Sequence, residues 1–188
     1  MRKLVLGSSS PARRALLERL QIPFECTSPD IDESPLPEED VTAMVLRLAE
    51  QKAKKAAQLY PDALVIGADQ VGTLEGKVFS KPETLENAIA QLQHVSGKMV
   101  RFYTGLCLYD TRNQTSQLAV ETYDVYFRKL SNEMIMDYLS KEMILNCAGS
   151  FHAEGLGVVL IKKMSGDDYT TLIGLPLIRL NEMLEKYK

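Results

Sequence analysis

The chain has 188 residues, 45% of them hydrophobic and 25% charged, a composition typical of a soluble globular protein with one large core or two lobes around a cleft. A net charge of −3 argues against polymeric nucleic acid as a partner, because such partners usually require a basic surface. Three widely spaced cysteines indicate neither a disulfide framework nor a zinc site, and the presence of only two histidines excludes a histidine-rich metal centre.

The N-terminal residues "MRKLVLG" contain too few apolar residues for the core of a signal peptide. No other run approaches the length that a membrane span requires. We therefore expect a cytoplasmic protein that does not enter a membrane.

The first third of the chain alternates between strand-like and helix-like patterns. The stretch "VLGSSSPARRALLERL" predicts a short strand, a turn of small residues and a helix, and a turn at a helix N-terminus can hold an anion. A short strand is predicted at Phe24–Thr27, followed by a loop rich in Pro, Ser and acidic residues. Residues 40–60 show helical periodicity that ends before Pro61.

The middle of the chain predicts a buried strand and two hairpins. Residues 63–71, "ALVIGADQV", form a near-continuous apolar run, typical of a strand buried on both faces. The segment "TLEGKVF" predicts a hairpin turn, and the helical pattern that follows it stops at Gly97. Two alternating segments, 99–110 and 117–129, predict the antiparallel strands of the second hairpin.

The last third predicts two helices and one strand. Ser131 is expected to cap a helix, and the glycine-rich segment "NCAGSFHAEGLG" leads into a strand at residues 158–162. A closing amphipathic helix carries Pro176 near its first turn. The alternation of elements places the chain in the α/β or α+β class. Because no repeat or linker is visible, we treat residues 1–188 as one domain.

The helix predicted at residues 40–60 has a lysine where its pattern requires an apolar residue. Its apolar positions are Val41, Val45, Leu48, Ala56 and Leu59. Their spacing requires an apolar residue at position 52, and the sequence has Lys52 there. The lysine either reaches the surface along its aliphatic stem or points its charge into a cleft.

Two adjacent arginines follow the serine turn. Arg13 precedes Leu16 and Leu17 by three and four residues, so it shares the buried face of its helix. Arg14 points outward, where it can pair with Glu18. Arg13 is therefore the better candidate for a functional cation, the alternative being a structural bond to a carboxylate or to a helix end.

A carboxylate stands at the end of the predicted buried strand. The run "VIGA" leads directly into Asp69 and Gln70, and ligands of open α/β sheets bind beyond the carboxyl ends of the strands. Asp69 could bind Mg²⁺ or act as general base toward water, or it could cap the following turn. Lys81 adds a cation in a connection that we expect to be exposed. By itself this lysine does not indicate a functional site.

The loop before the second long helix supplies further carboxylates, at Asp30, Asp32 and Glu33. Paired carboxylates are a common magnesium platform, although most acidic loops are only solvated. The combination is more informative than its parts. A turn of N–H donors, three cations and acids for a divalent metal would together match a nucleoside triphosphate.

These motifs occur together in one known family. In chain order they are "SSSPARR", "DIDES", "LRLAEQKA", "GADQ", "SKP", "CAGSFHAEG" and "GLPL". In this combination the sequence resembles the Maf-like nucleotide pyrophosphatases over nearly its whole length. The resemblance implies a strongly twisted mixed β-sheet with flanking helices in two lobes, related in shape to inosine-triphosphate pyrophosphatases. It also implies hydrolysis of nucleoside triphosphates to the monophosphate and diphosphate, with Mg²⁺, Mn²⁺ or Co²⁺.

The resemblance implies roles for individual residues. Those that would contact the triphosphate are Ser8, Ser10, Arg13, Lys52 and Lys81. Glu33 and Asp69 would hold the metal, and Asp69 would accept the proton of the attacking water. Such roles agree with the chemistry, because positioning and charge neutralisation carry most of phosphoryl-group transfer.

Three positions separate two branches of that family. The branch that acts on UTP and dTTP usually reads "SPRR", "ADT" and "AYGIQG" where this chain reads "SPAR", "ADQ" and "SFHAEG". Ala12, Gln70 and Glu154 therefore place the chain closer to the branch that acts on 7-methyl-GTP. A carboxylate such as Glu154 accepts hydrogen bonds from the guanine edge, and N7-methylation makes the purine cationic. Ala12 departs from that branch, in which a large, often aromatic residue is expected to stack on the base.

Two other hypotheses stay open at this point. One is a UTP/dTTP or broader modified-nucleotide pyrophosphatase, and the other is a nucleotide-binding regulator of septum formation and cell division. A pure binder has no use for a catalytic base, which favours an enzyme. The expected partner is a small nucleotide substrate, and the resemblance suggests a homodimer.

Overall fold

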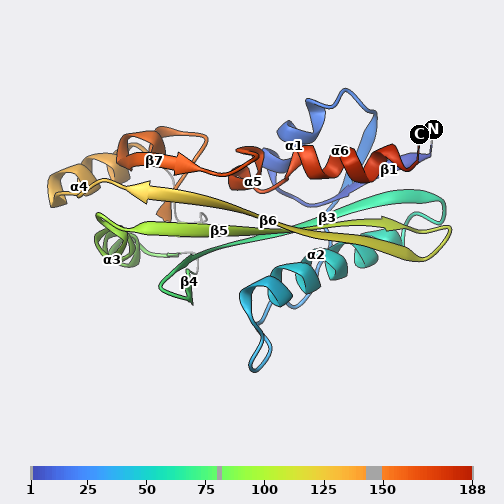
Figure 1. The fold of residues 1–188 in the computed structure, drawn as a ribbon, viewed down its shortest axis with the longest axis horizontal. Coiled ribbons are helices and arrows are strands. Elements are labelled where there is room, and N and C mark those ends of the chain that lie inside the picture. Colours follow the sequence, from blue (N-terminus) through green and yellow to red (C-terminus); the bar gives the residue numbers. More distant parts are fainter. Residues whose placement is uncertain (1, 80–81, 143–149, 188) are drawn as a thin grey trace. The chain divides into compact units, whose positions relative to one another are not determined.

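The computed structural model describes residues 2–79, 82–142 and 150–187 (Figure 1). Its elements in chain order are β1 (Lys3–Gly7), α1 (Pro11–Glu18), β2 (Phe24–Thr27), α2 (Val41–Ala57), β3 (Ala63–Leu74), β4 (Lys77–Val78), α3 (Leu85–Val95), β5 (Met99–Asp110), β6 (Thr115–Phe127), α4 (Asn132–Lys141), the 3₁₀ helix η2 (Leu156–Leu160), β7 (Ile161–Ser165), α5 (Thr170–Ile173) and α6 (Leu177–Glu185). No helix within the described ranges is long and apolar enough to cross a membrane.

The strands of the described residues form one seven-stranded mixed sheet. Its order is β2-β1-β3-β5-β6-β7, with β4 paired to β3 outside this path. β1 runs parallel to both β2 and β3, whereas β4 is antiparallel to β3 and β7 is antiparallel to β6. The mixed α/β class, with a mixed sheet and flanking helices, is therefore confirmed.

The chain divides into two compact units. The first unit comprises residues 1–70, 103–121 and 168–188, and the second comprises residues 71–102 and 122–167. The long strands β3, β5 and β6 each contribute residues to both units, so the units are interleaved along the sequence. The treatment of residues 1–188 as one domain stays a prediction.

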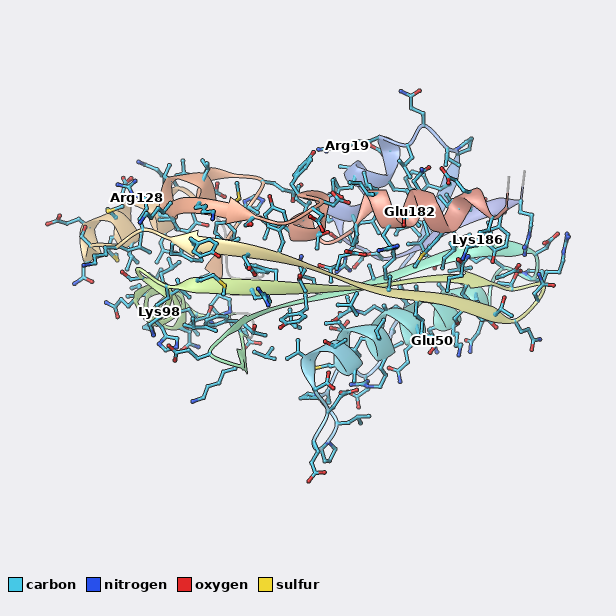
Figure 2. All side chains as sticks on the ribbon, viewed as in Figure 1. Arg19, Glu50, Lys98, Arg128, Glu182 and Lys186 are labelled. Atoms are coloured by element: carbon cyan, nitrogen blue, oxygen red, sulfur yellow. The ribbon has the colours of Figure 1, made fainter. Side chains whose placement is uncertain are left out.

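Helices cover both faces of the sheet in the first unit. α1 and α6 lie on one face and α2 on the other (Figure 1), and Glu182 on α6 and Glu50 on α2 mark these two helix layers (Figure 2). The larger core lies under α1 and α6 and includes Leu6, Leu16, Leu17, Ile66, Leu106 and Leu180. The core under α2 is built from smaller side chains, among them Val5, Ala49, Ala53, Ala56 and Val65.

α2 lies close to the sheet because glycines face it. A Cβ at Gly67 of β3 would lie 2.1 Å from the carbonyl oxygen of Ala49 and 2.7 Å from the amide nitrogen of Ala53. A Cβ at Gly105 of β5 would lie 2.1 Å from the carbonyl oxygen of Val45. Real Cβ atoms do not approach backbone so closely, so these glycines set the distance between helix and strands.

The second unit has its own buried residues. The rings of Phe102 and Phe127 flank that of Phe151, with centroid distances of 6.2 and 5.4 Å. The Glu142 carboxylate accepts hydrogen bonds from the backbone N–H of Leu156 and contacts His152 Nδ1 at 2.8 Å. These contacts fix the turn that leads into η2.

Most predicted elements are confirmed, and the prediction of one strand is wrong in its bounds. The segment Phe24–Thr27 is a strand, residues 99–110 form β5, and Ser131 caps α4. The strand predicted at residues 158–162 begins only at Ile161, because Leu156–Leu160 form a 3₁₀ helix. A short apolar run has no periodicity that separates a strand from a helical turn.

Candidate active site

Two carboxylates meet on one buried ammonium group in the first unit. Lys52 Nζ lies 2.7 Å from Asp69 Oδ1 and 2.8 Å from Glu33 Oε1. Lys52 and Asp69 are only 8% and 6% exposed, whereas the side chain of Glu33 is 58% exposed. Lys52 therefore directs its charge at two acids instead of extending along the surface. Of the two alternatives for this lysine, the structure selects the buried cation.

Asp69 owes its position to β3 and to the parallel pairing with β1. Gly7 of β1 is opposite Gly67, and Asp69 follows two residues later on the same strand. β3 continues to Leu74, so Asp69 lies inside the strand and does not cap a turn. The serine turn begins at Ser8, directly after β1 ends at Gly7. Because β1 and β3 are parallel, the serine turn and Asp69 both lie just beyond the carboxyl end of β1.

Lys52 reaches the carboxyl end of β1 because α2 packs against both β1 and β3. A Cβ on Gly7 would lie 3.3 Å from the carbonyl oxygen of Lys52. Its neighbour Ala53 packs on Gly67, as described above. The helix ends at Ala57, so Leu59 lies beyond it and is 70% exposed, although the sequence pattern had assigned it to the apolar stripe.

The serine turn is shaped by its own hydroxyl groups. Ser10 is the N-cap of α1, and its Oγ accepts a hydrogen bond from the amide of Arg13 at 3.3 Å. The buried Ser8 Oγ accepts from the amide of Ser10 at 3.2 Å. A hydroxyl that accepts can still donate its proton. Both serines thus keep the capacity to donate to a phosphate oxygen while they hold the turn in place.

Arg13 and Arg14 differ as the helical phase predicts. Arg14 Nε donates to Glu18 Oε1 at 3.2 Å on the exposed face. Arg13 is half-buried, and its Nε donates to the carbonyl oxygen of Gly174, the C-cap residue of α5, at 2.8 Å. Burial lowers the pKa of the Arg13 guanidinium below its ordinary value, and the charges of Asp69 and Glu33 act in the opposite direction. Arg13 therefore bonds a helix end, and the charges of the two carboxylates act on its guanidinium.

The loop that carries Glu33 is fastened to α2 by a residue that the sequence analysis missed. Arg47 Nη2 donates to the carbonyl oxygen of Ser34 at 3.1 Å, and its Nε lies 2.6 Å from Glu39 Oε1. Hydrogen bonding to Arg47 holds the pKa of Glu39 below its ordinary value. Asp32 Oδ1 accepts from the amide of Ser34 at 2.9 Å, so Asp32 shapes the same loop. Asp30 is exposed.

Gln70, next to Asp69, bonds the segment that precedes α6. Its Nε2 donates to the carbonyl oxygens of Thr171 and Leu172 at 2.6 and 3.0 Å, and to Thr104 Oγ1 at 3.0 Å. The motif "GLPL" begins at Gly174, directly after this segment. The contact between "GADQ" and the residues before "GLPL" was not visible in the sequence, because the two motifs lie a hundred residues apart.

The remaining predicted residues are Ala12, Glu154 and Lys81. Ala12 is partly exposed in the first turn of α1. Glu154 is exposed in the turn before η2, in the second unit. Lys81 lies outside the described residues.

Glu33 and Asp69 have the chemistry of a partial divalent-cation site. Within the described ranges, no group of three or more Asp, Glu, His or Cys side chains could hold a metal ion. Mg²⁺ usually takes one or two carboxylates from the protein and its other oxygens from water and substrate phosphates. Two carboxylates that already converge on one cation, the Lys52 ammonium, fit that pattern.

Comparisons with known proteins give a family match. A family model described as Maf-like protein matches residues 3–187. Among solved structures, the chain is similar to the Ham1 protein of Staphylococcus aureus, with 13% identity over 68% of this chain and 72% of that chain and a TM-score of 0.49. It is also similar to a HAM1 protein from Coxiella burnetii, with 14% identity over 69% and 75% of the two chains and a TM-score of 0.47. The family match spans every residue of the candidate site.

Proposed function

This chain belongs to the Maf-like protein family, whose members are nucleoside triphosphate pyrophosphatases, and we propose that its substrate is 7-methyl-GTP. The products would be 7-methyl-GMP and diphosphate, which would remove a modified nucleotide from the cellular pool. The family supports a hydrolase that acts on phosphoric anhydride bonds. The residue roles rest on one observation above all, the buried Lys52 that two carboxylates share.

Asp69 is the proton acceptor in this proposal. Lys52 holds Oδ1 of the carboxylate at 2.7 Å, which fixes the orientation of its second oxygen. That oxygen can orient a water and take its proton as the water attacks the α-phosphorus. The new bond joins the water oxygen to the α-phosphorus. The bond from this phosphorus to the bridging oxygen breaks, and diphosphate leaves with the electron pair.

The cations and the serine turn bind the triphosphate. Arg13 presents a guanidinium that can pair with phosphate oxygens, and the amides at the start of α1 favour an anion. Ser8 and Ser10 donate from the same turn, and Lys81 adds a further cation. A divalent metal, held by Glu33 and Asp69, would offset the charge that develops on the phosphates.

The choice of 7-methyl-GTP is supported by the three positions that separate the family's branches. Glu154 suits a purine that carries N–H donors and a positive charge. Ala12 and Gln70 differ from the residues usual in the UTP/dTTP branch. The small Ala12 leaves the stacking partner of the base unassigned.

A substrate panel tests the proposal. Diphosphate release is measured for 7-methyl-GTP, GTP, UTP and dTTP, with Mg²⁺ or Mn²⁺ added and again with the metal chelated. We expect the highest kcat/KM for 7-methyl-GTP and no turnover in the presence of the chelator. Faster turnover of UTP would contradict the substrate, and no turnover of any nucleotide would contradict the enzymatic proposal.

The Asp69→Asn variant tests the proton acceptor. We expect turnover to fall by about 10²–10⁴-fold, the usual contribution of a general base, while nucleotide binding is largely kept. The matched control is Asp137→Asn, because the Asp137 side chain is 63% exposed and pairs only with the surface residue Lys141 among the contacts seen. Full activity of Asp69→Asn would remove Asp69 from this role.

A further inference from the structure

We propose that Glu142 is a positioning residue that holds the turn carrying Glu154, and so sets the affinity of the protein for the base of the nucleotide. The inference rests on the proposed role of Glu154 in recognition of the purine. It is carried by hydrogen bonds within the second unit that join both sides of this turn to one carboxylate.

The Glu142 carboxylate bridges the residues that lie two positions before and two positions after Glu154. Its Oε2 lies 2.8 Å from His152 Nδ1, and its Oε1 accepts from the amide of Leu156. These hydrogen bonds hold the pKa of Glu142 below its ordinary value, the one with His152 having the larger effect. Because a charged carboxylate can only accept, Nδ1 of the imidazole carries the proton of that contact. Each oxygen of Glu142 thus fixes one side of the turn.

The backbone closes the same turn. The carbonyl oxygen of His152 accepts from the amides of Gly155 and Gly157 at 3.3 and 3.2 Å. The amide of His152 donates to the hydroxyl of Tyr138 on α4 at 3.0 Å, and the side chain of Tyr138 is fully buried. Glu154 lies in the middle of this closed turn and is exposed. Its backbone is therefore held in place while its side chain stays exposed.

Two glycines of the motif "EGLG" leave the room that this packing needs. A Cβ on Gly155 would lie 2.6 Å from His152 Nδ1 and closer still to Glu142 Oε1. A Cβ on Gly157 would lie 2.6 Å from a ring carbon of Phe151 and closer still to the carbonyl oxygen of His152. Real Cβ atoms do not approach other atoms so closely. The spacing of the glycines thus matches the contact between Glu142 and the turn, independently of the hydrogen bonds.

The segment that enters the turn is anchored without Glu142. The buried Ser150 donates through its Oγ to Gln91 Oε1 on α3 at 2.7 Å. The ring of Phe151 packs between two other aromatic rings, as described above. Loss of the Glu142 carboxylate should therefore release the turn around Glu154 and leave the rest of the second unit folded.

An ordered turn matters for recognition of a base. A carboxylate discriminates between bases only when it is held within hydrogen-bonding distance of the base edge. A glutamate on a mobile turn would lose conformational entropy each time a ligand binds, which weakens affinity. Because Glu142 orders the turn in the protein without ligand, this entropy is lost on folding and not on binding.

The test separates the base from the phosphates. KM and kcat for 7-methyl-GTP and the inhibition constant of inorganic tripolyphosphate with Mg²⁺ are measured for the wild type and for Glu142→Met, which removes both acceptor oxygens. We expect the KM for 7-methyl-GTP to rise about tenfold, the factor that corresponds to one lost charge-assisted hydrogen bond, with little change in kcat. The inhibition constant of tripolyphosphate, which has no base, should stay at its wild-type value.

Three further variants separate positioning from a general loss of structure. Glu133→Met makes the same substitution at an exposed residue of α4 and should change neither constant. Glu142→Gln should keep most of the affinity, because its oxygen can accept from the amide of Leu156 while its NH₂ donates to His152 Nδ1 in the other tautomer. Tyr138→Phe keeps the buried ring and removes the acceptor of the His152 amide, so it should raise the KM in the same direction even if Glu142→Met does not fold.

The effect of Glu142 should also pass through Glu154. Glu154→Ala removes the carboxylate that the turn carries and should raise the KM for 7-methyl-GTP by itself. In that background Glu142→Met should cause little further rise.

Each contrary result has a definite meaning. If Glu154→Ala raises the KM for 7-methyl-GTP and a folded Glu142→Met variant does not, this inference alone is overturned. A tripolyphosphate inhibition constant that rises together with the KM would also overturn it, because the substitution would then disturb more than a base contact, as would effects of the two substitutions that simply multiply. An unchanged KM in Glu154→Ala would contradict the role of Glu154 in the proposed function, and the inference with it.

Discussion

Lys52 is the residue on which the charge balance of the site depends. Its ammonium is shared by the buried Asp69 and the exposed Glu33. Removal of one partner of a buried ion pair leaves the other charge without compensation and usually costs about 3–5 kcal/mol. Lys52 therefore contributes both to stability and to the geometry of the proposed proton acceptor.

The Lys52→Met variant separates these two contributions. We expect it to fold with a free energy of unfolding lowered by about 3 kcal/mol, and to lose most of its turnover. Urea unfolding followed by circular dichroism, with diphosphate release measured under conditions where the variant is folded, checks both. Lys55→Met, an exposed position on the same helix, should change neither quantity. Normal turnover of a folded Lys52→Met variant would contradict the assignment.

Helical phase was enough to identify some residues of the site and not others. It singled out Lys52, because a charge interrupted an apolar stripe, and it separated Arg13 from Arg14. It could not show that Glu33 approaches Lys52, because the loop that carries Glu33 has no periodicity. The bond from Arg47 to this loop was missed for the same reason.

Among the elements, the turn between β5 and β6 depends on a buried acid. The side chain of Asp110 is fully buried, and its Oδ1 accepts from Arg2 Nη2 at 2.6 Å and from the amides of Arg112 and Asn113 at 2.9 and 3.2 Å. The hydrogen bond from Arg2 is the main cause that holds the pKa of Asp110 well below its ordinary value of 3.8. The folded state therefore favours the charged form, and the unfolded state binds the proton more readily.

This difference gives a pH-dependent prediction. The stability that Asp110 supplies is fully present above pH 3.8 and is lost as the pH falls below that value toward the depressed pKa of the folded state. Asp110→Asn should therefore have a lower free energy of unfolding than the wild type at pH 7, by about 2–3 kcal/mol, and the gap should narrow as the pH falls. Urea unfolding across this range measures it, with the exposed Asp137→Asn as control. A gap that does not change with pH would contradict the linkage.

Local patterns predicted most elements of the sheet and its helices, with limits that have physical causes. Alternation and caps found β5 and the start of α4, because side-chain period and capping chemistry are local. The strand predicted at residues 158–162 wrongly includes the last three residues of η2, since "LGVVL" is apolar throughout and has no period. α5 was missed because four residues, Thr170–Ile173, are too few to show helical periodicity. The hydrogen bonds from Gln70 to this helix join segments that are distant in the sequence, so no local pattern predicts them.

At the scale of the whole molecule, the net charge is unfavourable for the proposed ligand. The chain carries −3 and the triphosphate is strongly anionic, so binding depends on charges gathered locally. In the first unit these are Arg13 and Lys52, and they are opposed by Asp69 and Glu33. A divalent cation would reverse the effect of the two carboxylates, so we expect nucleotide binding by this protein to depend on the metal.

Thermal unfolding of the wild-type protein tests this dependence. The ligand is a 7-methyl-GTP analogue with a methylene group between the α and β phosphates, which cannot be hydrolysed there. At a concentration near a hundred times its Kd, with Mg²⁺, it should stabilise the fold by about 2.7 kcal/mol, which corresponds to a rise in Tm of about 5–10 °C for a chain of this size. With the metal chelated the rise should largely disappear, and 7-methylguanosine, which lacks phosphates, should produce little rise in either condition. An equal rise with and without the chelator would contradict the metal role of Glu33 and Asp69, and an equal rise with the nucleoside would contradict the triphosphate contacts.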